Sequence, residues 1–171
     1  MKKYILTVLV TLATLFQVQA VEPNVRIEES GDITVAPQFV YATRHSLAGL
    51  GVQAQFYAMD NLRIAPEFIV FFRNNDMTAY NADLNVHYII PKGNVNIYPL
   101  AGFAYARYKY ERTDASDGSK WDEKHDRIGA NIGVGTEYPI NDMLCFFAEE
   151  RFQLMKDFNQ LVTVLGVRIG F

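Results

Sequence analysis

The sequence predicts an all-β fold, an eight-stranded antiparallel up-and-down barrel, and three observations carry this prediction. After the first 20 residues, apolar and polar residues alternate with period two in eight successive segments. Gly, Pro, Asn and Asp separate these segments, and no stretch keeps the period of an amphipathic helix over three turns. The chain of 171 residues has the length of one domain, and its 50% hydrophobic residues exclude a disordered chain.

The N-terminal segment has the layout of a secretory signal. Lys2 and Lys3 form a basic start, an apolar run spans residues 4–16, and small residues precede a cleavage position after Ala20. The apolar run is shorter than the roughly 20 residues that a membrane-spanning helix needs. The sequence therefore predicts a signal peptide over residues 1–20 and one mature domain over residues 21–171.

The alternating segments define the expected strands in chain order. The clearest has Leu62, Phe68 and Phe72 on one face and Arg63 and Glu67 on the other. Tight turns are expected on one side of the barrel, and three short connections and one long loop on the other. The expected strands are 32–44, 48–59, 61–73, 77–90, 95–110, 125–139, 142–155 and 158–171, and the long outer loop is about 111–124.

Two barrels of opposite polarity fit this pattern. A secreted lipocalin-like carrier would place its apolar face inside, whereas a transmembrane barrel places it against lipid. The polar face holds few lysines and many small residues, which suit the narrow interior of eight strands. Aromatic residues lie near the strand ends of the apolar face, where interfacial girdles occur. The pattern favours a transmembrane barrel, with the secreted small-molecule carrier as an alternative.

The C-terminus carries a family resemblance. The segment Gly166-Val167-Arg168-Ile169-Gly170-Phe171 follows eight alternating strands and ends on an aromatic residue. The chain thus resembles the small outer-membrane β-barrel family of the OmpX and OmpA-barrel type, although Leu165 replaces the usual polar residue before the glycine. The resemblance implies a location in the outer membrane of a Gram-negative-type bacterium and contact with outer-membrane lipid and lipopolysaccharide. It also implies that the barrel assembly machinery reads Gly166, Ile169 and Phe171 as an assembly signal.

The resemblance extends to a family that includes adhesins, structural barrels and a few lipid-modifying enzymes, so the histidines are candidate catalytic residues. His45 precedes Ser46 and His125 precedes Asp126, but adjacency in sequence does not provide a base and a nucleophile in reach of each other. The acidic loop lacks the alternating oxygen ligands of a calcium loop. The sequence predicts no catalytic residue, no cofactor and no metal, with a lipid-modifying barrel enzyme as the alternative.

The charged residues on the inward face predict a salt-bridge network that plugs the lumen. Their heights, at about 3.3 Å per residue, divide them into layers. A periplasmic layer, a middle layer and a basic mouth are expected; the mouth either binds anionic groups of the outer leaflet or, as we favour, balances the acidic loop. These groups are Arg63, His87, Glu137 and Arg168; Glu67, Asp83, Glu149 and Arg151; and Arg73, Arg107, Lys109 and Arg127.

The long loop is the candidate contact site. It holds Asp114, Asp117 and Trp121, the single tryptophan of the chain. An exposed aromatic residue among charges suits a contact with a host or envelope component, and an inert connector is the alternative. A formal net charge of −3 gives no reason to expect nucleic acid. We expect a monomer, in which Glu150 faces lipid unless a bulge turns it inward.

Overall fold

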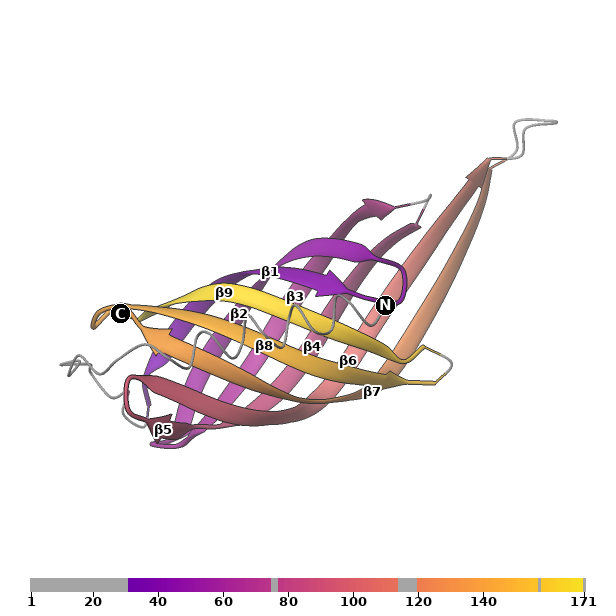
Figure 1. Cartoon of the computed structure of the whole chain (residues 1–171). Coiled ribbons are helices and arrows are strands. Elements are labelled where there is room, and N and C mark those ends of the chain that lie inside the picture. The colour runs from indigo at the N-terminus through magenta and orange to yellow at the C-terminus, as the bar shows by residue number, and fades with distance from the viewer. Residues whose placement is uncertain (1–30, 75–76, 114–119, 157, 171) are drawn as a thin grey trace, which may run out of the picture.

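The computed structural model describes residues 31–74, 77–113, 120–156 and 158–170 (Figure 1). All regular elements in these ranges are strands, as the alternating pattern predicted. They are β1 Ile33–Ala42, β2 Leu47–Met59, β3 Leu62–Asn74, β4 Met77–Tyr88, β5 Ile90–Lys92, β6 Val95–Thr113, β7 Lys120–Pro139, β8 Leu144–Met155 and β9 Gln160–Gly170.

The strands close into one antiparallel barrel. Except for β4 and β5, consecutive strands pair with each other, and β1 closes the ring by pairing with β9. The short β5 continues β4 along the same partner, since both pair with β6. Because β4 and β5 occupy one position in the wall, the barrel is eight-stranded. The predicted eight-stranded up-and-down fold is confirmed. Among the described residues, no helix is long and apolar enough to cross a membrane.

The outer wall of the barrel is apolar and the interior holds the charges. Phe103 and Ile128 are 73% and 76% exposed on the outside, whereas Arg63 and Arg151 are fully buried inside. Such a band of exposed apolar side chains needs a hydrocarbon solvent. The predicted transmembrane polarity is confirmed, and the secreted lipocalin-like carrier is excluded because its polarity is the reverse.

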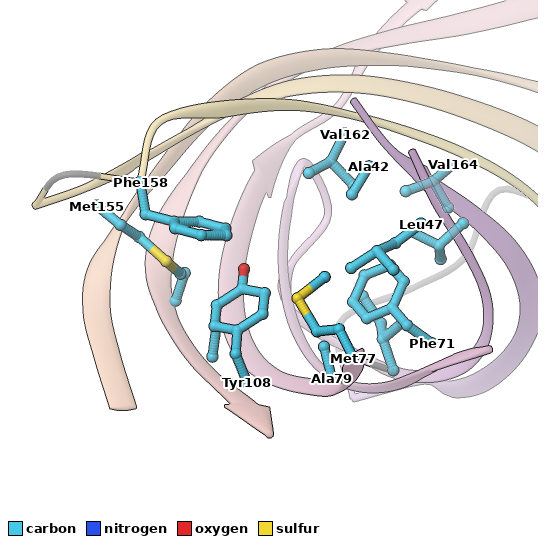
Figure 2. Close-up of a cluster of buried hydrophobic side chains, with 14 of the residues drawn as sticks. Ala42, Leu47, Phe71, Met77, Ala79, Tyr108, Met155, Phe158, Val162 and Val164 are labelled. Carbon is cyan, nitrogen blue, oxygen red and sulfur yellow. The ribbon is translucent and has the colours of Figure 1, made fainter. Parts of the chain in front are cut away.

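The interior differs from the uniformly polar lumen that the alternation suggested. Its outer part is filled by a buried apolar cluster, and Phe158 from the β8–β9 connection turns into the mouth (Figure 2). The Phe158 ring lies 4.3 Å from the ring of Tyr108 and 5.1 Å from that of His45. The cluster also includes Leu47, Ile69, Phe71, Met77, Phe147, Met155, Val162 and Val164.

The hairpin of β6 and β7 is longer than predicted. The two strands pair as far as Thr113 and Lys120, so both ends of the expected 111–124 loop continue the strands. Figure 1 shows this hairpin extending well beyond the rim of the barrel. The predicted loop boundaries were wrong because charged residues on both faces hide the alternation once a strand has water on both sides.

Glycines on the inward face make room for large neighbours. A Cβ atom at Gly135 would overlap the ring of Tyr98, which is fully buried. A Cβ atom at Gly166 would overlap the ring of Phe147 in the same way. The narrow interior of eight strands is filled where a large side chain lies against a glycine.

Replacing Gly135 by Ala is expected to destabilise the barrel by about 1–3 kcal/mol, because the added methyl group overpacks the ring of Tyr98. Urea unfolding in phospholipid vesicles measures the change. Gly170→Ala is the matched control, since the nearest atoms to its new Cβ lie 3.9 Å away. Equal stability of the two variants would contradict the packing argument.

Candidate functional site

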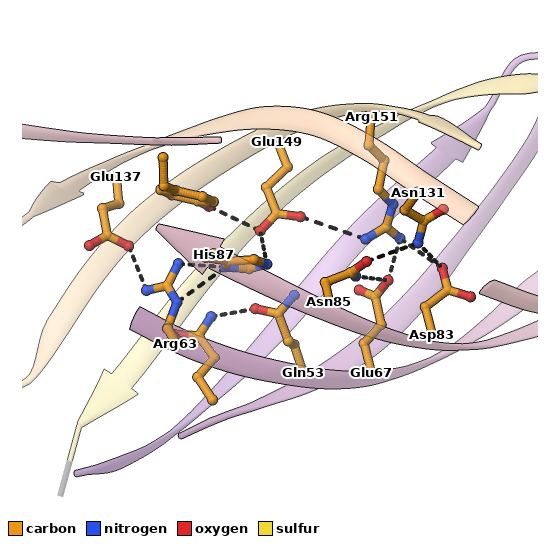
Figure 3. Close-up of polar contacts among 12 residues, drawn as sticks. Gln53, Arg63, Glu67, Asp83, Asn85, His87, Asn131, Glu137, Glu149 and Arg151 are labelled. Carbon is orange, nitrogen blue, oxygen red and sulfur yellow. Dashed lines mark hydrogen bonds and ion pairs between the residues drawn. The ribbon is translucent and has the colours of Figure 1, made fainter. Parts of the chain in front are cut away.

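A first group of charged side chains lies in the lumen near the periplasmic end. Arg63 on β3 is its centre, and its Nη1 atom donates to Glu137 at 2.9 Å (Figure 3). The same atom donates to the hydroxyl of Tyr57 at 3.0 Å. Its Nε atom donates to Nδ1 of His87 at 3.2 Å. Arg168 also lies 3.6 Å from Glu137. The four residues predicted for the periplasmic layer thus come together here.

A second group surrounds Arg151 on β8 at mid-height. Its guanidinium pairs with Glu67 and lies 3.6 Å from Asp83 and 3.7 Å from Glu149. Nε2 of His87 lies 4.0 Å from Glu149, which links this group to the periplasmic one (Figure 3). The hydroxyl of Tyr98 donates to the same carboxylate at 3.0 Å. The four residues predicted for the middle layer therefore also meet, and every one is buried.

Amide side chains complete the network, and the sequence analysis missed them. Gln38 donates to Glu67 at 2.7 Å, and Asn131 donates to Asp83 at 3.1 Å and to Asn85 at 3.0 Å. The available signal was the row of Asn and Gln residues in phase with the inward charges. Gln38 thereby reaches the Glu67 oxygen that Arg151 does not contact. Asn131 donates to the Asp83 oxygen that Arg151 also faces, and no described residue hydrogen-bonds to Oδ1 of Asp83.

The basic mouth does not form one patch. Arg107 is on the outward row of β6 and pairs with Asp126, whereas Arg127 follows on the opposite row of β7. The hydroxyl of Tyr105 also donates to Asp126 at 3.0 Å. Asp126 lies beyond the end of β8, outside the paired wall of the barrel. The hydrogen bond from Arg107 lowers the pKa of its carboxyl group. This pairing favours the charge-balance explanation for Arg107, with Asp126 as the partner.

The protruding hairpin leaves an open strand edge. β8 pairs with β7 only from Gly129 onward, and β4 reaches no farther along β6 than Tyr110. No other described strand pairs with the β8-facing edge of residues 120–128. The backbone groups of this edge are free to pair with another chain, because open edges are templates for strand addition.

The side chains above the rim are charged and aromatic. His125 lies 3.0 Å from Glu123, and its ring meets the edge of Tyr110 with centroids 5.9 Å apart. Arg107 lies over the ring of Tyr80, with its Cζ atom 5.8 Å from the centroid. This arrangement joins the hairpin to the rim and provides aromatic and charged contacts outside the barrel.

Several predicted residues lie outside the described part of the chain. These are Asp114 and Asp117 of the contact loop, the signal peptide of residues 1–20 and the terminal Phe171. The backbone of Trp121 belongs to β7, but its side chain is not described. Of the other assembly-signal residues, Gly166 lies opposite Phe147 inside the barrel, and Ile169 pairs with Val35.

The histidines do not form a hydrolase site among the described residues. His87 is buried against Arg63 and stacks on Tyr98 with ring centroids 4.9 Å apart. His45 packs on Phe158, and burial together with the neighbouring Arg44 lowers its pKa. No described serine is hydrogen-bonded to a histidine, and no described cluster of His, Cys, Asp and Glu could hold a metal ion.

A closed antiparallel barrel with an apolar wall and buried, paired charges inside defines an integral membrane β-barrel. The family model described as "Outer membrane protein beta-barrel domain" matches residues 31–166. The chain therefore belongs to this family and is a protein of the outer membrane. No curated protein sequence matches it.

Solved structures share the fold at low identity. The N-terminal barrel of Pseudomonas aeruginosa OprF has a TM-score of 0.67 at 15% identity, covering 84% of this chain and all of that one. Neisserial surface protein A has 0.62 at 16%, covering 81% and 96%. The Yersinia pestis attachment invasion locus protein Ail has 0.60 at 12%, covering 84% and 100%. At these identities the similarity establishes the fold alone.

Replacing Arg151 by Ala is expected to cost about 3 kcal/mol or more, because it leaves three buried carboxylates without their cation. Urea unfolding in vesicles measures the loss. Arg107→Ala removes an exposed arginine from its pair with Asp126 and is the control expected to change stability little. An Arg151→Ala variant as stable as the wild type would show that the middle group is not a salt-bridge network.

Proposed function

We propose that the protein is a structural outer-membrane barrel that acts at the cell surface, in adhesion or in binding a host or envelope component, through the β6–β7 hairpin. The observation that carries this proposal is the open β7 edge of residues 120–128 beyond the rim. Other described outer connections are short and offer little surface. A protruding strand edge gives a partner both backbone hydrogen bonds and side-chain contacts.

The solved relatives are consistent with this proposal without specifying a partner. One is named an attachment invasion locus protein and has been solved with the heparin analogue sucrose octasulfate. Another is the barrel domain of a larger protein. Because the shared fold hosts different surface functions, the hairpin of this chain has to be tested directly.

A plugged lumen belongs to the same proposal. Buried salt bridges and amides occupy the periplasmic part and the middle, and an apolar cluster occupies the outer part. Eight strands leave an interior wide enough for side chains but not for an aqueous channel. In this proposal the protein does not act as a diffusion pore, and its lipid and lipopolysaccharide contacts serve to hold the barrel in the membrane.

Replacing residues 111–124 with a short Asn-Gly turn is expected to abolish cell-surface binding and to leave a barrel whose gel mobility still changes on boiling. Loops and protruding turns tolerate such edits far better than strands in a membrane. Binding is measured as adhesion of expressing cells to immobilised host cells and matrix. Residues 93–94, which form the turn between β5 and β6 at the other end, are replaced by Asn-Gly as the control. Undiminished adhesion would make the hairpin a connector.

Deleting Phe171 is expected to lower the amount of barrel in the outer membrane and to induce envelope stress, because we propose that the assembly machinery reads this end. Quantitative immunoblotting of membrane fractions measures this amount, with Lys92→Ala on the exposed strand β5 as the control. The mass of the purified wild-type protein tests the proposed cleavage after Ala20. Normal abundance of the truncated chain would remove the assembly role.

A further inference from the structure

A carboxyl group faces lipid at mid-height of the barrel. On β8 the outward row is Phe146, Ala148, Glu150, Phe152 and Leu154, and the two phenylalanines are 40% and 42% exposed. The strand runs in regular register past Glu150, with no bulge to turn the side chain inward. The expected outward orientation is therefore the one observed, and Glu150 occupies it at the height of the middle charge group.

The contacts of Glu150 do not compensate a charge. Among the described residues, only the hydroxyl of Thr163 on β9 hydrogen-bonds to it, donating to Oε2 at 2.8 Å. Arg151, the next residue, points to the opposite face and is fully buried in the lumen. An unpaired carboxylate in hydrocarbon is costly, so the group takes up a proton and becomes neutral.

A neutral carboxyl group is both a donor and an acceptor. The Thr163 hydroxyl donates to one oxygen of the carboxyl group. Lipid tails provide no hydrogen-bond partner for its O–H group or its other oxygen. Two such groups satisfy each other across a two-fold axis, because each donates to the other. Two barrels in one membrane are related by such an axis along the membrane normal, which brings β8 of one against β8 of the other.

The surface around Glu150 permits this approach. Its cross-strand neighbours are Val134 on β7 and Thr163 on β9, and on its own row it lies between Ala148 and Phe152. Glu150 is the only charged side chain on the outward rows of β8, β9 and residues 128–139 of β7. No repulsion between other charges therefore opposes contact with the same surface of a second copy. Three of these four neighbours are short, and short side chains beside a polar group are the composition of helix contacts within membranes. We apply the same packing argument to strands.

We infer that the β8 wall is a self-association site, at which the carboxyl groups of Glu150 from two copies of the chain pair within the membrane. This differs from the monomer expected from the sequence. It does not depend on the proposed role of the hairpin, which lies outside the membrane.

The test is energy transfer between donor- and acceptor-labelled protein in phospholipid vesicles at increasing protein-to-lipid ratio. Dyes are attached through Lys92→Cys, an exposed position, since Cys145 is buried. Glu150→Leu is expected to lower the dimerisation constant at least about tenfold, the effect of one to two hydrogen bonds in a membrane. Leucine suits a lipid-facing position, so the variant should still fold and keep its heat-dependent gel mobility.

Glu150→Gln tests whether a side chain that both donates and accepts hydrogen bonds is enough for pairing. An amide also donates and accepts, so this variant should still dimerise, whereas Glu150→Leu should not. Val70→Leu, on the lipid-facing row of β3, is the control expected to leave association unchanged. A wild-type protein that stays monomeric at every density, or a Glu150→Leu variant that dimerises as the wild type does, would overturn the inference. Loss of dimer in the Gln variant as well would also overturn it.

Discussion

The closure of β1 against β9 is the constraint on which the rest of the structure depends. Lipid tails offer no hydrogen-bond partner, so every backbone group within the membrane has to be satisfied by a neighbouring strand. The ring of antiparallel pairs meets this requirement without leaving an edge. Once the ring is closed, the pleat sends alternate residues to lipid and to the lumen, and this produces the period-two pattern.

The same constraint explains where an open edge is allowed. The edge of β7 is unpaired over residues 120–128, above the point at which β8 ends. Water satisfies backbone groups there, so an unpaired strand costs little. The charged residues Glu123, Lys124 and Asp126 along this part protect the edge from indiscriminate pairing. The hairpin is therefore the part of the barrel that is free to vary with function.

The lumen follows a second rule, which is that buried charges must be paired. Arg63 pairs with Glu137, Arg151 lies among three carboxylates, and the amides of Gln38 and Asn131 supply further donors. The outer part of the lumen avoids the cost of burying charge by using an apolar cluster capped by Phe158. Glu150 is the exception, because its carboxyl group lies on the lipid-facing wall. A group that departs from both rules marks a place where the barrel contacts something other than lipid.

The sequence by itself determined the fold class, the polarity of the wall and the members of both lumen groups. Period-two alternation defines which residues share a face, and height along a strand follows from a constant rise per residue. The grouping of Arg63 with Glu137, and of Arg151 with Glu67, needed no more than that.

Only the tertiary structure decided the features that depend on contact between distant strands. The apolar outer cluster escaped prediction because Val162, Val164 and Ile69 are in phase with charges, and alternation alone does not distinguish a buried apolar residue from a buried polar one. The pairing of Arg107 with Asp126 depends on the register of β6 and β7. The open edge of β7 follows from the unequal lengths of neighbouring strands, and relative strand length is a property of the closed barrel rather than of any one segment.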